Sequence, residues 1–310
     1  MDKVLVTGVD ELVGANVAWT LADRCEMVAL SRRGTAPADC RLLDCDADDP
    51  NDVARHIETE APRYVIHCGP LSRSAWDLAD SPLADVDHEI RLALQMVEAA
   101  EQIDARLLVV TTDGLFAGPR MFHGEEARPA ASGRVRDAAL ALEQALSNSS
   151  ALVIRTHAYG WSPAGAEVNY AERLWNALSR GEPCQGDAER HATPILASDL
   201  AELIYKALLL RLQGRIHMTG AERTSPFRFA AALATAGGFA GRHVRVSDDE
   251  PRRGNVDETS LNTQLVRRQL GTPLPLLREG LARFVTQAAN GYREKLEGNA
   301  VWAVVQSAAA

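Results

Sequence analysis

Short apolar runs alternate with helix-like periods of apolar residues over the first 160 residues of the chain. The pattern predicts strands at 4–7, 26–31, 41–44, 64–68, 106–111 and 151–155, and helices at 14–23, 52–60, 82–102 and 129–143. Strands and helices that alternate at this spacing form βαβ units, which build a parallel sheet covered by helices on both faces. The unbroken apolar run at 107–110 is typical of a strand that is buried on both sides.

The pattern becomes less regular after residue 160. It predicts helices at 169–179, 198–211, 226–236 and 274–290, a short strand at 214–218 and a loop at 237–241. We therefore expect a dinucleotide-binding-like core at 1–160, a mixed α/β substrate lobe at 161–300 from which some core elements can return, and a tail at 301–310. The predicted fold class is α/β, a Rossmann-type doubly wound parallel sheet with a smaller C-terminal substrate-binding lobe. The cleft should lie at the carboxyl ends of the strands.

Charge and hydropathy exclude several classes of protein. The net charge of −9 and the isoelectric point near 5.4 argue against nucleic acid as a partner, because phosphates require a concentrated basic face. No run approaches the ~18 to 20 apolar residues that cross a bilayer, and the N-terminus begins directly with a strand. We expect no membrane association and a cytoplasmic location.

The chain contains five cysteines at irregular spacing. None forms a CxxC pair, and no group of cysteines and histidines has metal-ligand spacing, so we expect no metal site. Reduced thiols are the simpler interpretation of an odd number of cysteines. The five are Cys25, Cys40, Cys45, Cys68 and Cys184.

A glycine turn follows the first predicted strand, with Gly8 and Gly14 before the first helix. In dinucleotide-binding folds such a turn lets the backbone approach a pyrophosphate, which lies at the helix N-terminus. Two glycines alone are weak evidence, but six further segments make the pattern specific. They are TTDGLFAG at 111–118, Glu126 to Pro129, LVIRT at 152–156, TPI at 193–195 with DLA at 199–201, GRIHMTG at 214–220, and TSLN at 259–262.

These segments, in this order and over about residues 4–285, resemble the dTDP-4-dehydrorhamnose reductase-like group of the extended short-chain dehydrogenases/reductases. The resemblance implies NADP(H) as cofactor, a nucleotide or nucleotide-sugar as small-molecule ligand, and a homodimer or another protein as partner. It also implies a GxxGxxG turn, a catalytic Ser/Thr and a YxxxK pair. The positions implied for the cofactor are Gly8, Glu11, Leu12, Val13, Gly14, Ser31, Arg32, Arg33, Asp44, Cys45, Cys68, Gly69 and Pro70.

The turn departs from the family pattern at its middle glycine, which is Glu11, with Asp10 beside it. A carboxylate about 5 Å from a phosphate repels it by ~1–3 kcal/mol at an effective dielectric constant near ~20. Acidic residues at a helix start also favour the helix dipole, so Asp10 and Glu11 could occupy the anion site themselves. In contrast, Ser31, Arg32 and Arg33 match the small residue and arginine with which NADP users meet the 2′-phosphate; the alternative is a solvated arginine pair.

The catalytic pair is absent. After Pro129 the best register for YxxxK reads Ser132 and Arg136, and a shift of three residues places Val135 at the tyrosine position. The family's tyrosine protonates the carbonyl oxygen, and its lysine lowers the pKa of that phenol. A serine hydroxyl is too weak an acid near neutral pH, and a guanidinium does not give up its proton. Thr112 matches the family's catalytic Ser/Thr, which orients a carbonyl.

Another group could supply the proton. The resemblance places substrate contacts after the sixth predicted strand, where His157 and Tyr159 both can donate, and His157 is better matched to neutral pH. The alternative is that these residues form a hydrogen-bonded pocket wall. The family's asparagine on the long helix is replaced by an acid, with Asp87 or Glu89 nearest in register. The substrate positions implied are Thr112, Asp113, Thr156, His157 and Tyr159.

Two hypotheses of function follow. The first is a divergent family member that binds a nucleotide or nucleotide-sugar in a non-redox, regulatory or biosynthetic role, without the usual hydride transfer. The second is an active NADP(H)-dependent reductase of a 4-keto nucleotide-sugar or a related carbonyl, which uses Thr112 and an unconventional acid. The candidate catalytic residues are Thr112, Ser132, Arg136 and His157.

Overall fold

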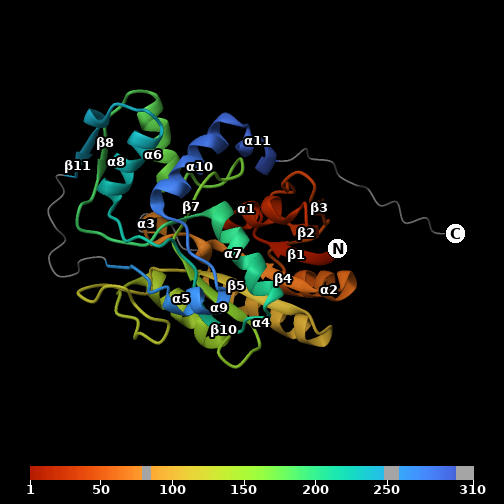
Figure 1. Cartoon of the computed structure of the whole chain (residues 1–310). Coiled ribbons are helices and arrows are strands. Elements are labelled where there is room, and N and C mark those ends of the chain that lie inside the picture. The colour runs from red at the N-terminus through yellow and green to blue at the C-terminus, as the bar shows by residue number, and fades with distance from the viewer. Residues whose placement is uncertain (79–84, 248–257, 298–310) are drawn as a thin grey trace.

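The computed structural model describes residues 1–78, 85–247 and 258–297. Its centre is a sheet of seven parallel strands (Figure 1). Their order across the sheet is β10 (Gly214–His217), β6 (Leu152–Thr156), β5 (Arg106–Thr112), β4 (Tyr64–His67), β1 (Asp2–Thr7), β2 (Cys25–Leu30) and β3 (Arg41–Leu42). The order reverses between β1 and β4, and in such sheets ligands bind outside the carboxyl ends of the strands at this point.

Helices cover both faces of the sheet because successive side chains of each strand point to opposite sides. Val4 and Val6 of β1 join one core, with α1 (Leu12–Leu21), α7 (Ala197–Leu209) and α9 (Gln264–Leu270). Leu5, between them, joins the other, with α2 (Pro50–Glu60), α4 (Val86–Gln102) and α5 (Arg134–Ala145). The side chains of β1 therefore pack into two apolar layers, one on each face of the sheet, as its continuous apolar sequence predicts.

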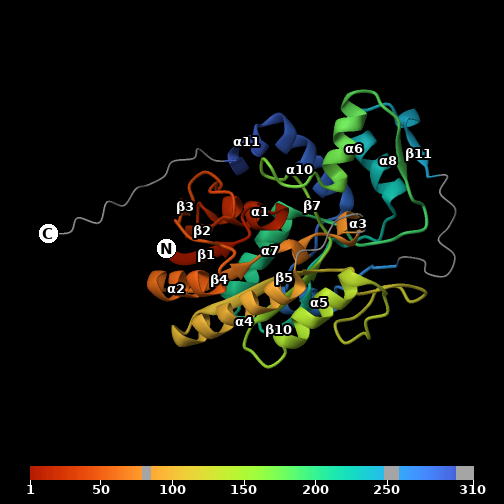
Figure 2. The ribbon, with the colours of Figure 1, turned by 180° about the vertical axis from the view of Figure 1, so that it is seen from behind.

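A smaller lobe lies at one end of the molecule, away from β2, β3 and α2 (Figures 1 and 2). It contains α6 (Tyr170–Ser179), α8 (Pro226–Ala236), α10 (Leu277–Ala289) and a short sheet of β8 (Cys184–Gly186) and β11 (Val244–Val246). Aromatic rings fill its core, where Trp161 stacks on Phe284 at 4.3 Å. The short strands β7 (Ala158–Tyr159) and β9 (Ile195–Leu196) pair with each other and link this lobe to the sheet.

Small elements complete the described chain. They are η1 (Pro70–Ser72), α3 (Ala75–Leu78), η2 (Gly241–His243) and α11 (Tyr292–Glu297). None of the helices in the described ranges has both the length and the apolar character that a membrane span requires.

The predicted Rossmann-type parallel sheet is confirmed, and most element boundaries agree to within two residues. The segment 161–300 returns a whole sheet strand, β10, and two covering helices, α7 and α9, to the core. The helix predicted at 129–143 is shorter, because α5 begins at Arg134 after Gly133, whose φ is +105°. The expected start of the long helix at 82 and the tail at 301–310 lie outside the described residues.

A buried ion pair joins β6 to α5. Arg155 donates to both carboxylate oxygens of Glu143, from Nε at 2.8 Å and from Nη2 at 2.6 Å, and both side chains are about 1% exposed. Glu143 also accepts a hydrogen bond from Thr111 of β5. Burial, together with the charge of Arg155, lowers the pKa of the neighbouring His217 to about 3, so this ring stays neutral. The pair is thus satisfied on several sides, as buried charges must be.

We expect Glu143→Leu to lower the free energy of unfolding by about 3–5 kcal/mol, because it leaves the Arg155 guanidinium buried without its counter-charge. The double variant Glu143→Leu/Arg155→Met removes both charges and should recover much of the loss. Urea unfolding followed by circular dichroism measures both. The exposed pair Arg180 and Glu182 is the matched control, and Arg180→Ala should cause no measurable change. Equal losses for the single and the double variant would contradict this account.

Candidate functional site

The turn between β1 and α1 needs its two glycines for packing alone. Gly8 has a φ of +74°, and a Cβ there would lie 2.0 Å from the carbonyl oxygen of Cys68. A Cβ on Gly14 would lie 2.1 Å from the carbonyl oxygen of Gly8. Both contacts are with backbone atoms, so a larger residue would force α1 away from β1 and from the turn after β4. The fold therefore requires these glycines whether or not a dinucleotide binds.

The carboxylate of Asp10 is bound by hydrogen-bond donors at the end of β2. It accepts from Ser31 Oγ at 2.8 Å and from the backbone N–H of Arg32 at 2.6 Å. The guanidinium of Arg33 donates to the Asp10 carbonyl oxygen at 3.0 Å. Asp10 and Ser31 are both buried. These are the groups that the resemblance assigns to a 2′-phosphate, and Asp10 already satisfies two of their donors.

Glu11 stands at the N-terminus of α1. It is the N-cap residue in an extended conformation, but its side chain makes no capping hydrogen bond. Burial raises the pKa of the Glu11 carboxyl above its usual value of 4.5, and the guanidinium groups of Arg73, Arg33 and Arg32 act in the opposite direction. A phosphate at this point would meet a carboxylate where backbone N–H groups otherwise attract an anion.

Buried polar groups adjoin the turn after β4. His67 Nδ1 lies 2.6 Å from Thr7 Oγ1, and the other ring nitrogen lies 3.6 Å from Glu89 Oε2. Glu89, from α4, also accepts a hydrogen bond from Arg32 Nη2 at 3.1 Å. Burial alone would raise the pKa of Glu89, but His67 and Arg32 lower it below its usual value. A Cβ on Gly69 would lie 2.6 Å from Glu89 Oε2, so the Glu89 carboxylate lies directly against the turn after β4.

The other positions implied for the cofactor lie in the core, at its edge or on the surface. Leu12, Val13 and Cys68 are buried in the layer that α1 shares with the sheet. Pro70 begins η1, Asp44 is exposed, and Cys45 packs at the edge of the layer under α2. The residues at the turn therefore do not fit NADP bound as the resemblance implies: carboxylates stand where the 2′-phosphate and the pyrophosphate would bind.

Thr112 ends β5 and is fully buried. Its Oγ1 accepts a hydrogen bond from the backbone N–H of Gly114 at 3.0 Å. Val135, in the first turn of α5, packs on the same turn, because a Cβ built on Gly114 would lie 3.0 Å from Val135 Cγ1 and 3.3 Å from Thr112 Oγ1. Of the two registers for YxxxK, the one that brings a side chain toward Thr112 has Val135 at the tyrosine position.

The other register points away from this turn. Ser132 is exposed and precedes α5, and Arg136 lies 2.6 Å from the neighbouring carboxylate of Asp137. In the register of Val135, the lysine position is Ala139, which is fully buried in an apolar cluster with Phe116. Neither register supplies an acid beside Thr112.

Asp113 and His157 form a buried pair at the ends of β5 and β6. His157 Nδ1 lies 2.7 Å from Asp113 Oδ2, and the same oxygen accepts a hydrogen bond from Thr259 Oγ1. Asp113 Oδ1 accepts from the backbone N–H of Ala75 at 2.9 Å, and the ring of Trp76 meets His157 edge to face at 4.4 Å. A carboxylate that holds one ring nitrogen orients an imidazole for proton transfer at the other. Here, however, the imidazole is only 1% exposed.

The two remaining substrate positions are held by the protein itself. Thr156 Oγ1 donates a hydrogen bond to the carbonyl oxygen of Met218 at 2.7 Å. The ring of Tyr159 meets Phe229 edge to face at 4.9 Å, and its hydroxyl lies against Gly280 of α10. Burial raises the pKa of Tyr159. The fold brings Thr112, Asp113, Thr156 and His157 together at adjacent strand ends, whereas Tyr159 belongs to the core of the smaller lobe.

Sequence reasoning missed Trp76, His67 and Thr259, which all contact residues of this site. His67 is the last residue of β4, the strand beside β1 at the cleft, and a polar residue at the end of a predicted apolar strand was a usable signal. Thr259 contacts Asp113 from 146 positions further along the chain, and nothing in its local sequence indicates that contact.

Comparisons with known proteins agree with this fold. A family model, RmlD substrate binding domain, matches residues 2–290. A dTDP-4-dehydrorhamnose reductase from Bacillus anthracis str. Ames, solved in complex with NADP, is 19% identical, with a TM-score of 0.74 over 93% of this chain and 99% of that chain.

Two other solved structures extend the likeness. A hypothetical dTDP-4-dehydrorhamnose reductase from Sulfolobus tokodaii is 21% identical, with a TM-score of 0.72 over 88% of this chain and 96% of that chain. A UDP-glucose 4-epimerase from Thermotoga maritima, solved with UDP-glucose, is 18% identical, with a TM-score of 0.75 over 94% of this chain and 99% of that chain. No curated protein matches the chain. At these identities the structures establish the fold alone, but the family model spans nearly the whole sequence, and the chain therefore belongs to the RmlD substrate binding domain family.

Proposed function

We propose that this protein binds a nucleotide or a nucleotide-sugar in its cleft and has a non-redox role, regulatory or biosynthetic, in place of hydride transfer. Family membership and the NADP, NAD and UDP-glucose bound to its structural neighbours support a nucleotide as the ligand. The observation that carries the non-redox part is the position of Val135, which packs on the Gly114 turn beside Thr112.

Proton supply is the reason that this position matters. Hydride addition to a ketone produces an alkoxide, and a positioned general acid that protonates it contributes about 10²–10⁴-fold to the rate. Valine has no proton to give, and Thr112 Oγ1 accepts a hydrogen bond from its own turn. The lysine that would lower the pKa of a phenol is replaced by the buried Ala139.

Asp10 and Glu11 argue against NADP(H), whose 2′-phosphate needs the donors at the end of β2. The Asp10 carboxylate accepts hydrogen bonds from Ser31 Oγ and Arg32 N–H, so these donors are already occupied and cannot bind an NADP 2′-phosphate. Glu11 adds a second carboxylate at the head of α1. A ligand without a 2′-phosphate, such as a nucleoside diphosphate or its sugar conjugate, does not require these donors.

One observation favours the alternative, an active NADP(H)-dependent reductase of a 4-keto nucleotide-sugar. Asp113 holds Nδ1 of His157, which orients the ring as a general acid would be oriented. His157 would then protonate the carbonyl oxygen that Thr112 orients. The ring is covered by Trp76, so this reading requires Trp76 to move when substrate binds.

A binding and turnover experiment on the full chain distinguishes the two functions. Isothermal titration with dTDP, UDP, a dTDP-sugar and NADPH should give micromolar binding for a nucleotide or its sugar and none for NADPH. NADPH oxidation with a 4-keto dTDP-sugar should not exceed the uncatalysed rate. Turnover with a kcat/KM of about 10⁴ M⁻¹s⁻¹ or more, lost in His157→Asn, would establish the reductase instead.

We expect Asp10→Asn/Glu11→Gly to raise the affinity for NADPH by about 30-fold or more, because each of the two carboxylates repels a phosphate by ~1–3 kcal/mol. The change is measured by NADPH fluorescence titration. The matched control is Asp23→Asn/Glu26→Gln, which removes two exposed carboxylates near the opposite, amino end of β2 and should leave the affinity unchanged. An equal gain in both double variants would mean that net charge alone controls binding.

Glu11 should also make stability depend on pH. Its pKa is raised in the folded state, so the folded protein holds this proton more tightly than the unfolded chain. The resulting stabilisation is present below the unfolded value of 4.5 and is lost as the pH rises through the folded pKa. Glu11→Gln should therefore gain in melting temperature over the wild type as the pH rises from 4 to 8. A difference that stays constant over this range would contradict the raised pKa.

A further inference from the structure

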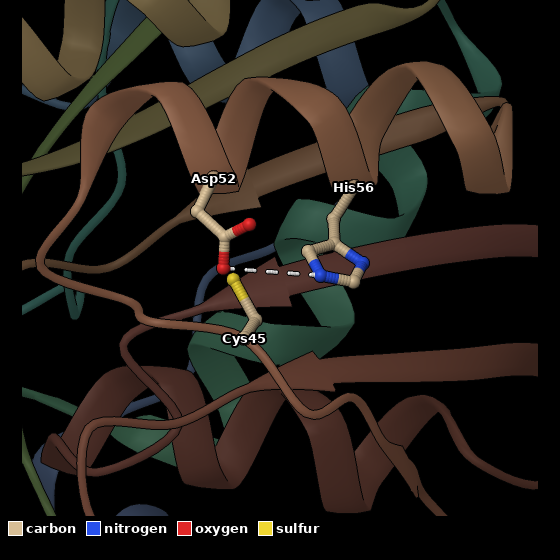
Figure 3. A group of neighbouring side chains, drawn as sticks. All are labelled: Cys45, Asp52 and His56. Carbon is tan, nitrogen blue, oxygen red and sulfur yellow. Dashed lines mark ion pairs between the residues drawn. The ribbon is translucent and has the colours of Figure 1, made fainter. Parts of the chain in front are cut away.

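A cysteine, an aspartate and a histidine lie together between β3 and α2 (Figure 3). Cys45 is in the segment that leads from β3, and Asp52 and His56 are on α2. Their sulfur, carboxylate oxygen and ring nitrogen all lie within 4.8 Å of one another. Figure 3 shows the three side chains converging from two segments of the chain. The sequence analysis expected no metal set, yet the fold brings these three donor types together.

Backbone geometry holds this cluster in place. Asp52 and His56 are four residues apart, so they lie on the same face of α2. The start of α2 is fixed by Asp49, whose side chain caps the backbone N–H of Asn51. The backbone N–H of Asp46 donates to Asp52 Oδ2 at 2.8 Å, which ties the segment that carries Cys45 to the helix. The three donors are therefore held in position by α2 and by the segment after β3, without the help of a metal ion.

We propose that Cys45, Asp52 and His56 bind a zinc ion. A thiolate, an imidazole and a carboxylate are the three ligand types of protein zinc sites, and three protein ligands leave a fourth position for water or another ligand. The side chains of Asp52 and His56 are 20% and 14% exposed, so an ion can enter from solvent. On binding, the Cys45 sulfur forms the bond to zinc and its proton passes to the solvent.

Arg55 shows that the cluster already attracts a cation. Its Nε donates to Asp52 Oδ1 at 3.0 Å, and its Nη2 lies 3.2 Å from His56 Nε2. The side chain is 62% exposed and emerges from the outer surface of α2, so the guanidinium can swing into solvent when an ion replaces it. Four further aspartates at 44–49 add negative charge to the same segment. The guanidinium is thus a competitor for the ion, and its removal should strengthen binding.

Cobalt(II) provides a direct test on the full chain after dialysis against a chelator. Co²⁺ should give a thiolate-to-cobalt charge-transfer band and the visible bands of a four-coordinate site, and one equivalent of Zn²⁺ should remove them. Cys45→Ser should abolish the charge-transfer band, and His56→Asn should weaken Zn²⁺ binding by at least ~10-fold. Arg55→Ala should tighten Zn²⁺ binding by a few-fold, which a merely structural cluster would not do.

The control is Cys40→Ser, which removes a cysteine of similar exposure outside the cluster and should leave the spectrum and the affinity unchanged. Circular dichroism shows that each variant is folded. The proposal fails if the wild type gives no cobalt spectrum at about 100 µM metal, or if Cys45→Ser retains the charge-transfer band. It also fails if Cys40→Ser loses the band, because the thiolate ligand would then lie elsewhere.

Discussion

The backbone at Gly8 passes so close to the strand end of β4 that no side chain fits between them. A Cβ there would lie 2.0 Å from the Cys68 carbonyl oxygen, and Gly14 is constrained in the same way by Gly8. This contact sets the spacing of β1, β4 and α1, and with it the position of the side chains on the turns that follow β1 and β4. The first and third glycines of the turn are thus required for packing, so their presence says nothing about a bound dinucleotide.

The middle position of the turn is free of that constraint, and there the chain has Glu11. With Asp10 it forms part of an internal charge system that includes Arg32 and Glu89, and this system satisfies the donors at the end of β2 without a ligand. Charges that compensate one another in this way stabilise the turn and raise the cost of introducing a phosphate beside it. A neighbour of the same fold from Bacillus anthracis was solved in complex with NADP, whereas in this chain Asp10 binds the Ser31 hydroxyl and the Arg32 N–H at the end of β2.

A second group of the implied site residues lies at the ends of β5 and β6. Val135 and Ala139 extend an apolar surface over the turn beside Thr112, and the polar residues that remain there, Asp113 and His157, bond to each other under Trp76. The side chains beside Thr112 and the carboxylates at the turn after β1 are independent observations, and both support the proposed non-redox role.

The sequence alone determined the class of fold, because βαβ periodicity and apolar runs are local properties. An unbroken apolar run such as that of β5, placed between helices, indicates a buried parallel strand. The sequence also identified the glycine turn, Thr112 and the lack of a YxxxK pair, since a motif is recognised from the type and the order of its residues. It left two registers open for α5, because the loop before Arg134 ends at Gly133 in a conformation that the sequence pattern did not fix. Contacts between separate segments were decided only by tertiary structure: Cys45 with the face of α2, and, at the strand ends, Asp10 with Ser31 and Asp113 with His157 and Thr259. The pairs at the strand ends form because strands from different parts of the chain end at one edge of the sheet, and no local pattern records which side chains meet there.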